Sequence, residues 1–164
     1  VETWRAFEKL LADGAVRAVG VSNFLPEHLD RLVSASDVVP AVNQIEVHPT
    51  FQQLDVQAAC RKLGIAVEAY SPLGRGADLE APAVEPIAST LGVTAAQVVL
   101  RWHVQQGAIV IPKSVSAERQ ATNIDVFSFE LDEEQMAVVS GLDAGAAGRT
   151  GADPASADFT QFRA

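Results

Sequence analysis

Four short apolar stretches of this chain each end in polar side chains, mostly amides and hydroxyls. These polar groups are Ser22 and Asn23, Asn43 and Gln44, Tyr70 and Ser71, and, just after Pro112, Lys113 and Ser114. In folds built on parallel strands, ligands bind at the carboxyl ends of the strands. We therefore expect these side chains to line one rim of the protein.

The chemistry of this rim suits a nicotinamide ring. Amides and hydroxyls complement a primary carboxamide, which both donates and accepts hydrogen bonds, and the face of Tyr70 matches a planar heterocycle. Ordinary turn chemistry explains any one of these pairs better than a ligand does, because Ser and Asn are common after strands. The coincidence of four strand ends favours the ligand site.

The segment after the fourth apolar stretch combines groups that attract an anion. Lys113, Ser114, Arg119 and the free amides of a helix expected from residue 117 together suit a phosphate. Arg119, Thr122 and Asn123 are spaced i, i+3 and i+4 and therefore share one helical face, where the arginine plane can stack on an adenine. The competing interpretation is a solvated helix start beside an incidental acidic neighbour.

Two glycines, Gly74 and Gly76, would let the backbone approach a pyrophosphate, although a mobile loop fits them equally well. Neither a P-loop nor a Gly-x-Gly-x-x-Gly fingerprint occurs, so a Rossmann nucleotide site has no direct support. The histidines lack metal-ligand spacing, and we expect no metal site. We expect His48 to be a hydrogen-bonded structural residue and Cys60 an unreactive core residue, because no basic partner lies near it in the sequence.

The elements that must position these groups alternate along the chain. Near-continuous apolar runs predict strands, buried on both faces, at residues 16–21, 38–47, 65–70 and 108–111. Helical periodicity predicts helices at residues 1–11, 27–34, 54–63, 84–91, 94–105, 117–124 and 133–142. Local signals agree: Pro26 in a first turn, Gly64 at a helix end, and capping boxes at Thr94 and Asp132.

Alternating strands and helices predict an α/β fold with a mostly parallel sheet. Four such units fit either a small doubly wound sheet or half of an eight-stranded barrel, whose full form needs roughly 250 residues. We expect residues 1–142 to form one unit and residues 143–164 an irregular tail, ordered only where Phe159 and Phe162 find a surface. The chain begins inside a helical pattern at Val1, so we expect it to be a piece of something longer.

The amino-acid composition limits the classes of partner that the chain can bind. The 164 residues are 48% hydrophobic and carry a net charge of −9, which argues against nucleic acid and anionic membrane surfaces. We expect no membrane span, since no stretch approaches the roughly 18 apolar residues required. A single cysteine forms no internal disulfide, which suits the reducing cytoplasm.

Four motifs occur in the order and approximate spacing of a known family. They are Gly20-Val21-Ser22-Asn23-Phe24, Asn43-Gln44 with Glu46 and His48-Pro49, Tyr70-Ser71-Pro72-Leu73-Gly74, and Ile111-Pro112-Lys113-Ser114. Over nearly its whole length the chain resembles the aldo-keto reductases, and among them the bacterial group similar to 2,5-diketo-D-gluconic acid reductases. The resemblance implies the C-terminal half of a (β/α)8 TIM barrel: four parallel strands with flanking helices.

The resemblance further implies an NADP(H) site without a Rossmann fold. The implied contacts are Ser22, Asn23 and Gln44 with the nicotinamide carboxamide, Tyr70 with the ring, Ser71, Leu73 and Gly74 with the pyrophosphate, Lys113, Ser114, Val115 and Arg119 with the adenosine 2′-phosphate, and Asn123 with the adenine. One departure is Thr122, where the family often has Glu or Gln facing the adenine.

The family's catalytic Asp, Tyr, Lys and His belong to the first half of its barrel, and this chain lacks those segments. Tyr70 is the only tyrosine, and its position matches ring stacking. A missing general acid costs roughly 10²–10⁴-fold in rate. We therefore expect an NADP(H)-dependent reductase of small carbonyl substrates, represented here by a cofactor-binding half that is inactive alone and holds no catalytic residue.

Two other interpretations remain open. The first is a non-catalytic half-barrel that binds the cofactor or only pairs with another half, because four strands without closure leave two open edges that invite self-association. The second is a free-standing open α/β domain without a nucleotide role, against which the strand-end pattern argues.

Overall fold

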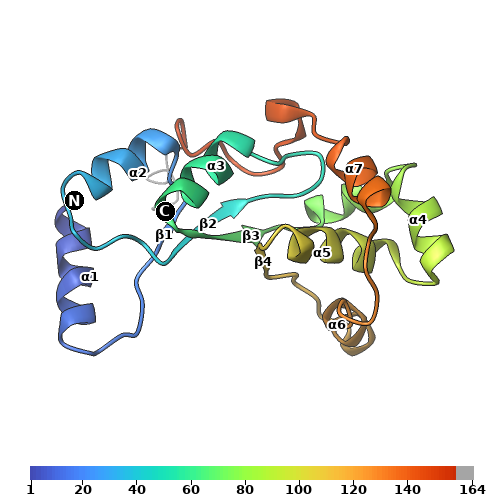
Figure 1. Ribbon diagram of the computed structural model, residues 1–164, viewed down its shortest axis with the longest axis horizontal. Coiled ribbons are helices and arrows are strands. Elements are labelled where there is room, and N and C mark those ends of the chain that lie inside the picture. Colours follow the sequence, from blue (N-terminus) through green and yellow to red (C-terminus); the bar gives the residue numbers. More distant parts are fainter. Residues whose placement is uncertain (158–164) are drawn as a thin grey trace, which may run out of the picture.

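A four-stranded parallel sheet forms the centre of the molecule. The computed structural model describes residues 1–157. Its strands β1 (Val21–Ser22), β2 (Val42–Glu46), β3 (Ala66–Tyr70) and β4 (Ile109–Val110) are neighbours in chain order (Figure 1). This order lacks the reversal that defines a doubly wound sheet. Right-handed crossovers that always step in one direction place their helices on one face of the sheet.

The helices agree with the sequence expectations to within two residues at each end. They are α1 (Glu2–Ala12), α2 (Pro26–Val33), α3 (Leu54–Leu63), α4 (Val84–Leu91), α5 (Ala95–Gln105), α6 (Ala117–Ile124) and α7 (Glu133–Ser140), with 3₁₀ turns η1 (Gly74–Glu80) and η2 (Gly145–Gly148). Thr94 and Asp132 form the expected capping boxes, and Gly64 ends α3 with a φ of 71°. Side chain–backbone bonds at these caps fix where the helices begin.

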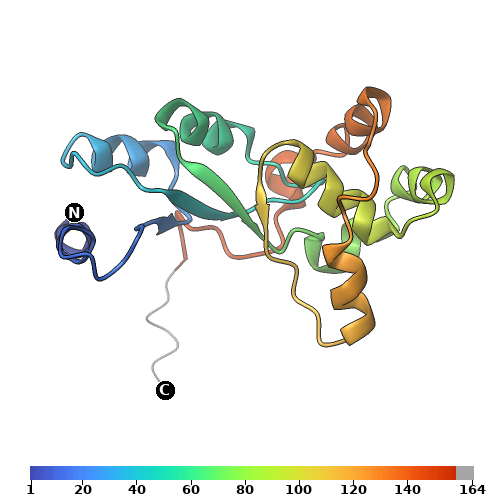
Figure 2. The ribbon, with the colours of Figure 1, turned by 60° about the horizontal axis from the view of Figure 1, so that its bottom comes forward.

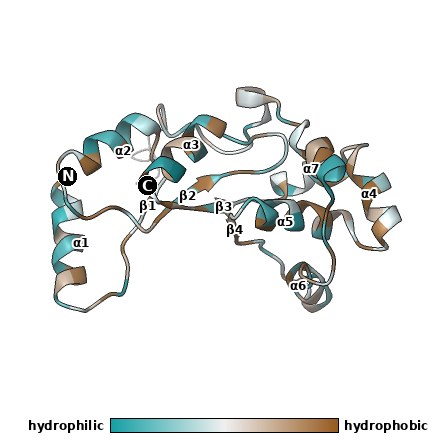
Figure 3. Ribbon diagram, viewed as in Figure 1, coloured by the Kyte–Doolittle hydropathy of each residue, from teal (hydrophilic) through white to brown (hydrophobic). Residues whose placement is uncertain are grey.

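One face of the sheet packs on helices and forms the first core. Ile45 and Val67 of the strands meet Leu29 of α2 and Val56 and Cys60 of α3. Helices α2 and α3 lie side by side over this face (Figures 1 and 2). Figure 3 shows hydrophobic and hydrophilic turns alternating along the helices, as expected when only one side of each is buried.

A second core gathers α4, α5 and α7 beyond β4. Trp102 is fully buried in it with Val98 and Val139, and the Trp102 indole donates a 2.9 Å hydrogen bond to Ser140 Oγ. This second core supports the loops that follow β3 and β4.

The opposite face of the sheet is open, which corrects the expectation of strands buried on both faces. Register places Ser22, Gln44, Glu68 and Ile109 in one row across the four strands, and Ile109 and Ile111 are 47% and 44% exposed. The edge strands are also shorter than expected, two residues each, because each pairs on one side only. An apolar run alone does not reveal whether a partner covers it.

The segment after α7 is anchored by polar contacts. Ala144 N donates to Thr50 O at 2.9 Å, and Thr150 N donates to Glu46 Oε1 at 2.8 Å. The expectation that only Phe159 and Phe162 would order this tail is therefore wrong for its first part, and those two residues lie outside the described range. Within residues 1–157, no helix has the length and apolar character needed to cross a membrane.

Gly20 should be intolerant of substitution because β1 approaches β2 closely there. A Cβ at Gly20 would lie 2.4 Å from Val42 Cγ1 and 2.8 Å from Val42 O, and overpacking of this kind costs about 1–3 kcal/mol. We expect Gly20→Ala to lower the free energy of unfolding by that amount in urea denaturation. Gly141→Ala is the control, since its nearest atom is 3.3 Å away; equal losses for both variants would contradict the close-approach explanation.

His103 of α5 should make stability fall at mildly acidic pH. Its ring is buried against Pro72 O, with Nε2 3.0 Å from that oxygen, and burial lowers the pKa of His103 to about 4. In the unfolded chain His103 binds a proton as the pH falls through 6.5, whereas in the folded chain it does so only near pH 4. The contribution of His103 to the free energy of unfolding is therefore fully present above pH 6.5 and is lost as the pH falls toward 4. We expect wild type to lose ~2 kcal/mol more than His103→Gln between pH 7 and pH 5 in urea unfolding; parallel pH profiles would contradict this.

Candidate functional site

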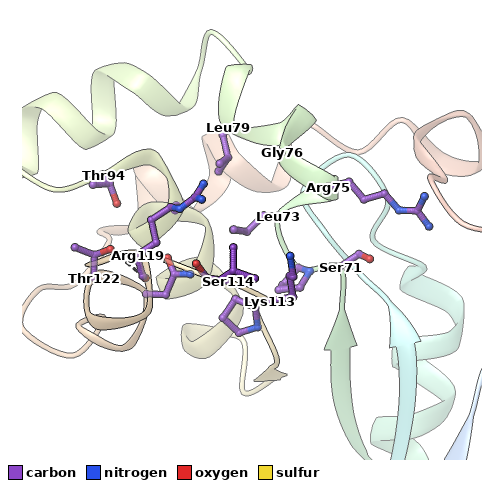
Figure 4. A pocket seen from close by; sticks show the side chains of 15 residues that line it. Ser71, Leu73, Arg75, Gly76, Leu79, Thr94, Lys113, Ser114, Arg119 and Thr122 are labelled. Carbon is purple, nitrogen blue, oxygen red and sulfur yellow. Dashed lines mark hydrogen bonds between the residues drawn. The ribbon is translucent and has the colours of Figure 1, made fainter. Parts of the chain in front are cut away.

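Two clefts lie at the carboxyl ends of the strands. The first, of about 540 Å³, lies between the loop after β3, the loop after β4 and α6 (Figure 4). The second, of about 410 Å³, lies between the ends of β1 and β3 and the tail residues 151–154. Arg75 lines both clefts, so the two adjoin at its side chain.

Ten of the twelve predicted cofactor residues line these clefts. The first cleft contains Ser71, Leu73, Lys113, Ser114, Val115, Arg119 and Asn123. The second contains Ser22, Asn23 and Tyr70. Gln44 and Gly74 line neither. The structure therefore brings together residues that are up to 101 positions apart in the sequence.

The first cleft is positively charged in an acidic protein. Lys113, Arg119 and Arg75 line it, and its lining includes no carboxylate. Within residues 1–157 none of these three cations forms an ion pair. Ser116 caps α6, its hydroxyl accepting from Arg119 N at 3.3 Å. Lys113 and Arg119, two cations beside the start of α6, make a site for a phosphate group.

The second cleft brings the neutral polar groups of Ser22, Asn23 and Tyr70 together beside Arg75 and the tail. The Tyr70 hydroxyl donates to Asn23 Oδ1 at 3.1 Å, and Ser22 Oγ donates to Gln44 O at 3.0 Å. Burial and the neighbouring Glu46 carboxylate raise the pKa of the Tyr70 hydroxyl, which therefore stays protonated at neutral pH. An aromatic ring beside a free amide can take a flat ring that bears a carboxamide.

Asn43 does not belong to the rim, contrary to the expectation for the strand ends. Its side chain is fully buried on the helix-covered face, where Nδ2 donates to Phe24 O at 2.9 Å and Oδ1 accepts from Phe24 N at 3.3 Å. The alternation of side chains along β2 sends Asn43 and Gln44 to opposite faces. Asn43 thus positions the Ser22–Asn23 loop, while the Gln44 amide on the open face donates to Glu68.

Gly74 likewise supports the site from beneath. It is buried with a φ of 56°, and a Cβ there would lie 2.6 Å from Asp78 Oδ2. Only glycine combines that backbone conformation with so close a carboxylate. Gly74 therefore shapes the loop whose neighbours Leu73 and Arg75 line the first cleft.

Strained backbone is concentrated at the clefts. Among the described residues four non-glycines have positive φ, and three of them, Asn23 (57°), Ser71 (49°) and Arg75 (55°), line the clefts. Such conformations cost about 1–3 kcal/mol each and gather at functional sites. This is independent support for a binding role of the strand ends.

Several lining residues were not predicted as site residues. Arg75, in the loop expected near a pyrophosphate, Thr94, expected only as a helix cap, and Leu79 line the first cleft. Gly151 and Pro154 of the tail line the second. The tail returns toward the strand ends only through long-range hydrogen bonds, which no local pattern reveals.

The remaining candidates fall outside the clefts. His48 is fully buried and hydrogen-bonded, as predicted, and Cys60 is buried, where desolvation raises the pKa of its thiol. The described part of the chain contains no cluster of three or more potential metal ligands.

The sequence matches the family model "Aldo/keto reductase family" over residues 1–144. An aldo-keto reductase of Mycobacterium sp. (strain KMS) is 51% identical over 160 residues, which cover 98% of this chain and 57% of that protein. Morphine 6-dehydrogenase of Pseudomonas putida is 48% identical and is matched over 99% of this chain and 58% of its own length. The chain thus spans little more than half of these relatives.

Solved structures agree. A mutant of the protein Gox0644 in complex with NADPH superposes with a TM-score of 0.93 at 48% identity, covering 96% of this chain and 58% of that one. The four parallel strands and their helices therefore have the arrangement seen in aldo-keto reductase barrels. On the family model and these relatives, the chain belongs to the aldo/keto reductase family.

Proposed function

We propose that this chain carries the NADP(H)-binding part of an aldo-keto reductase that reduces carbonyl compounds to alcohols by hydride transfer. One observation supports this most strongly: a cleft lined by Lys113 and Arg119 adjoins, at Arg75, a cleft lined by Ser22, Asn23 and Tyr70. A dinucleotide phosphate has the same division, with a charged adenosine 2′-phosphate at one end and a neutral carboxamide ring at the other. The NADPH complex of the Gox0644 mutant adds to this support.

The residues of both clefts fit the two ends of the cofactor. Ser22, Asn23 and Gln44 would hold the carboxamide with Tyr70 against the ring, while Lys113, Ser114, Val115 and Arg119 would take the 2′-phosphate and Asn123 the adenine. Ser71 and Leu73 would border the pyrophosphate, with Gly74 beneath them. The nicotinamide, when bound, supplies the hydride; the chain's own part is to orient the ring and exclude water from one side of it.

We also propose that residues 1–142 form the C-terminal half of a (β/α)8 barrel, followed by a tail from residue 143. The open row of Ser22, Gln44, Glu68 and Ile109 supports this, because a barrel buries that face inside itself. In the complete enzyme the substrate is a small carbonyl compound. This chain alone would bind cofactor without turnover, since Tyr70, its only tyrosine, is committed to the ring site.

The alternative is a module that binds NADP(H), or pairs through its open edges, without any catalytic partner. The exposed Ile109 and Ile111 at the last strand favour association with other chain segments over an isolated half. To separate the two interpretations, this chain is mixed with the N-terminal half of a relative's barrel. Carbonyl turnover by the mixture supports the reductase and its absence supports the non-catalytic module.

A titration of the chain with NADPH tests the proposal directly. Both tryptophans are buried, and neither lines a cleft. Energy transfer from these tryptophans to the bound dihydronicotinamide therefore reports binding without direct contact between them. We expect saturable quenching in the micromolar range, and no oxidation of NADPH with an aldehyde present. Absence of quenching from a chain with a folded circular dichroism spectrum would refute independent cofactor binding.

Arg119 should distinguish the two cofactors. Removal of its guanidinium takes a charge-assisted hydrogen bond from the 2′-phosphate, which is worth roughly 10- to 100-fold in affinity. We expect Arg119→Ala to weaken NADPH by that factor and NADH by little. Glu118→Ala, on the same exposed helix outside the cleft, should change neither. An equal loss for both cofactors would sink the assignment of the 2′-phosphate site.

A further inference from the structure

A buried histidine behind the site contacts two carboxylates. His48 is 0% exposed, and Glu46 and Asp78 are each 1% exposed. His48 Nδ1 lies 2.7 Å from Asp78 Oδ2, and His48 Nε2 lies 3.3 Å from Glu46 Oε1. The two ring nitrogens thus join two acidic groups that are 32 residues apart in the sequence and belong to different walls of the clefts.

On one side, Asp78 holds the loop that forms a wall of the first cleft. Thr50 Oγ1 donates to Asp78 Oδ1 at 2.7 Å, and Asp78 fills the space beside Gly74 that a side chain would occupy. The same short turn, η1, contains Arg75 and Leu79, whose side chains line the cleft (Figure 4). Arg75 there extends away from Arg119, toward the second cleft.

On the other side, Glu46 holds the tail that forms a wall of the second cleft. Its carboxylate accepts hydrogen bonds from Thr150 N at 2.8 Å, from the Thr150 hydroxyl and from Gly151 N at 3.0 Å. A Cβ at Gly151 would lie 2.7 Å from Glu46 Oε2 and 3.8 Å from the Tyr70 hydroxyl. The tail is therefore seated directly between Glu46 and the aromatic residue of the site.

We propose that His48, Glu46 and Asp78 form a clamp that fixes the tail and the η1 turn relative to each other, and that His48 is a positioning residue for the cofactor. The clamp touches no ligand itself. It acts through two segments, residues 150–154 and 74–79, which in the described part of the chain are joined by no direct hydrogen bond or ion pair. The cofactor role rests on the proposed function, whereas the coupling between the two walls does not.

The burial of three ionisable groups is what makes the clamp act as a unit. Burial alone would raise the pKa values of Glu46 and Asp78, but hydrogen bonds from Thr150 and Gly151 to the first, and from His48 and Thr50 to the second, lower both pKa values instead. Loss of Asp78 takes the nearest partner from His48 Nδ1 and leaves the buried ring held against Glu46 alone among the acidic groups. A change at Asp78 should therefore reach the tail, which Asp78 does not contact.

Hydrogen exchange of the whole chain tests this coupling without any cofactor. In Asp78→Asn we expect peptides covering residues 148–154 to exchange about tenfold faster than in wild type, the factor for one charged hydrogen bond. Glu80→Gln removes a carboxylate from the same turn, but an exposed one outside the clamp, and should leave the tail unchanged. Faster exchange confined to residues 73–80 in Asp78→Asn would overturn the clamp.

The reverse experiment covers the case in which Asp78→Asn does not fold. Thr150→Val keeps the backbone donors of the tail and removes one hydroxyl from Glu46, and it should accelerate exchange in residues 73–80 by a smaller factor. Unchanged protection there would also overturn the proposal. If Asp78→Asn does not fold, faster exchange of residues 73–80 in Thr150→Val establishes the coupling.

Cofactor titrations then separate the clamp from the binding proposal. In a folded clamp variant, affinities for NADPH and NADH should fall by the same factor, because the clamp sets the walls and does not contact the 2′-phosphate; a loss for NADPH only would refute the positioning role. If wild type binds neither cofactor, the proposed function fails while the exchange result stands on its own.

Discussion

Parallel pairing of neighbouring strands is the constraint on which the rest of this structure depends. Because all four strands run the same way, every strand ends at the same edge, and each following loop begins there. The crossover helices occupy one face, so polar side chains that a ligand can reach gather at the edge or on the open face. The two clefts, the strained residues that line them and the contacts of the tail all lie at or near that edge.

The charge distribution shows a second level of organisation. The chain has a net charge of −9 with 12 lysine and arginine residues, yet Lys113, Arg119 and Arg75 line one cleft whose lining has no acidic residue. Glu46 and Asp78 near the site are buried in contacts with His48, and the partly buried Glu68 is hydrogen-bonded to Gln44 on the open face. The charged side chains that line the cleft are therefore all positive.

Short-range interactions made the helices predictable from the sequence, whereas much of the site depends on long-range contacts that the sequence does not reveal. The caps at Thr94 and Asp132 and the left-handed Gly64 are encoded within a few residues, and they placed helix ends almost to the residue. Asn43 and Gln44 must point to opposite faces of β2, but which of them faces the helices depends on how the strand is seated in the sheet, which an apolar run does not define. The contact of Glu46 with Thr150 joins positions 104 apart. The sequence indicates the loop that contains Arg75, but only the tertiary structure places the Arg75 side chain at both clefts.

The strained residues and the buried acids have a common explanation. Asn23, Ser71 and Arg75 hold left-handed conformations that, among the other described non-glycine residues, only Gln53 shares. A protein retains such conformations only when its surroundings enforce them. Each surrounding is present: Asn43 binds both backbone groups of Phe24, the His103 ring binds Pro72 O, and Asp78 fills the space beside Gly74. A rim that must be rigid before a ligand arrives needs this support, and the fold supplies it from behind, through side chains that never reach the clefts.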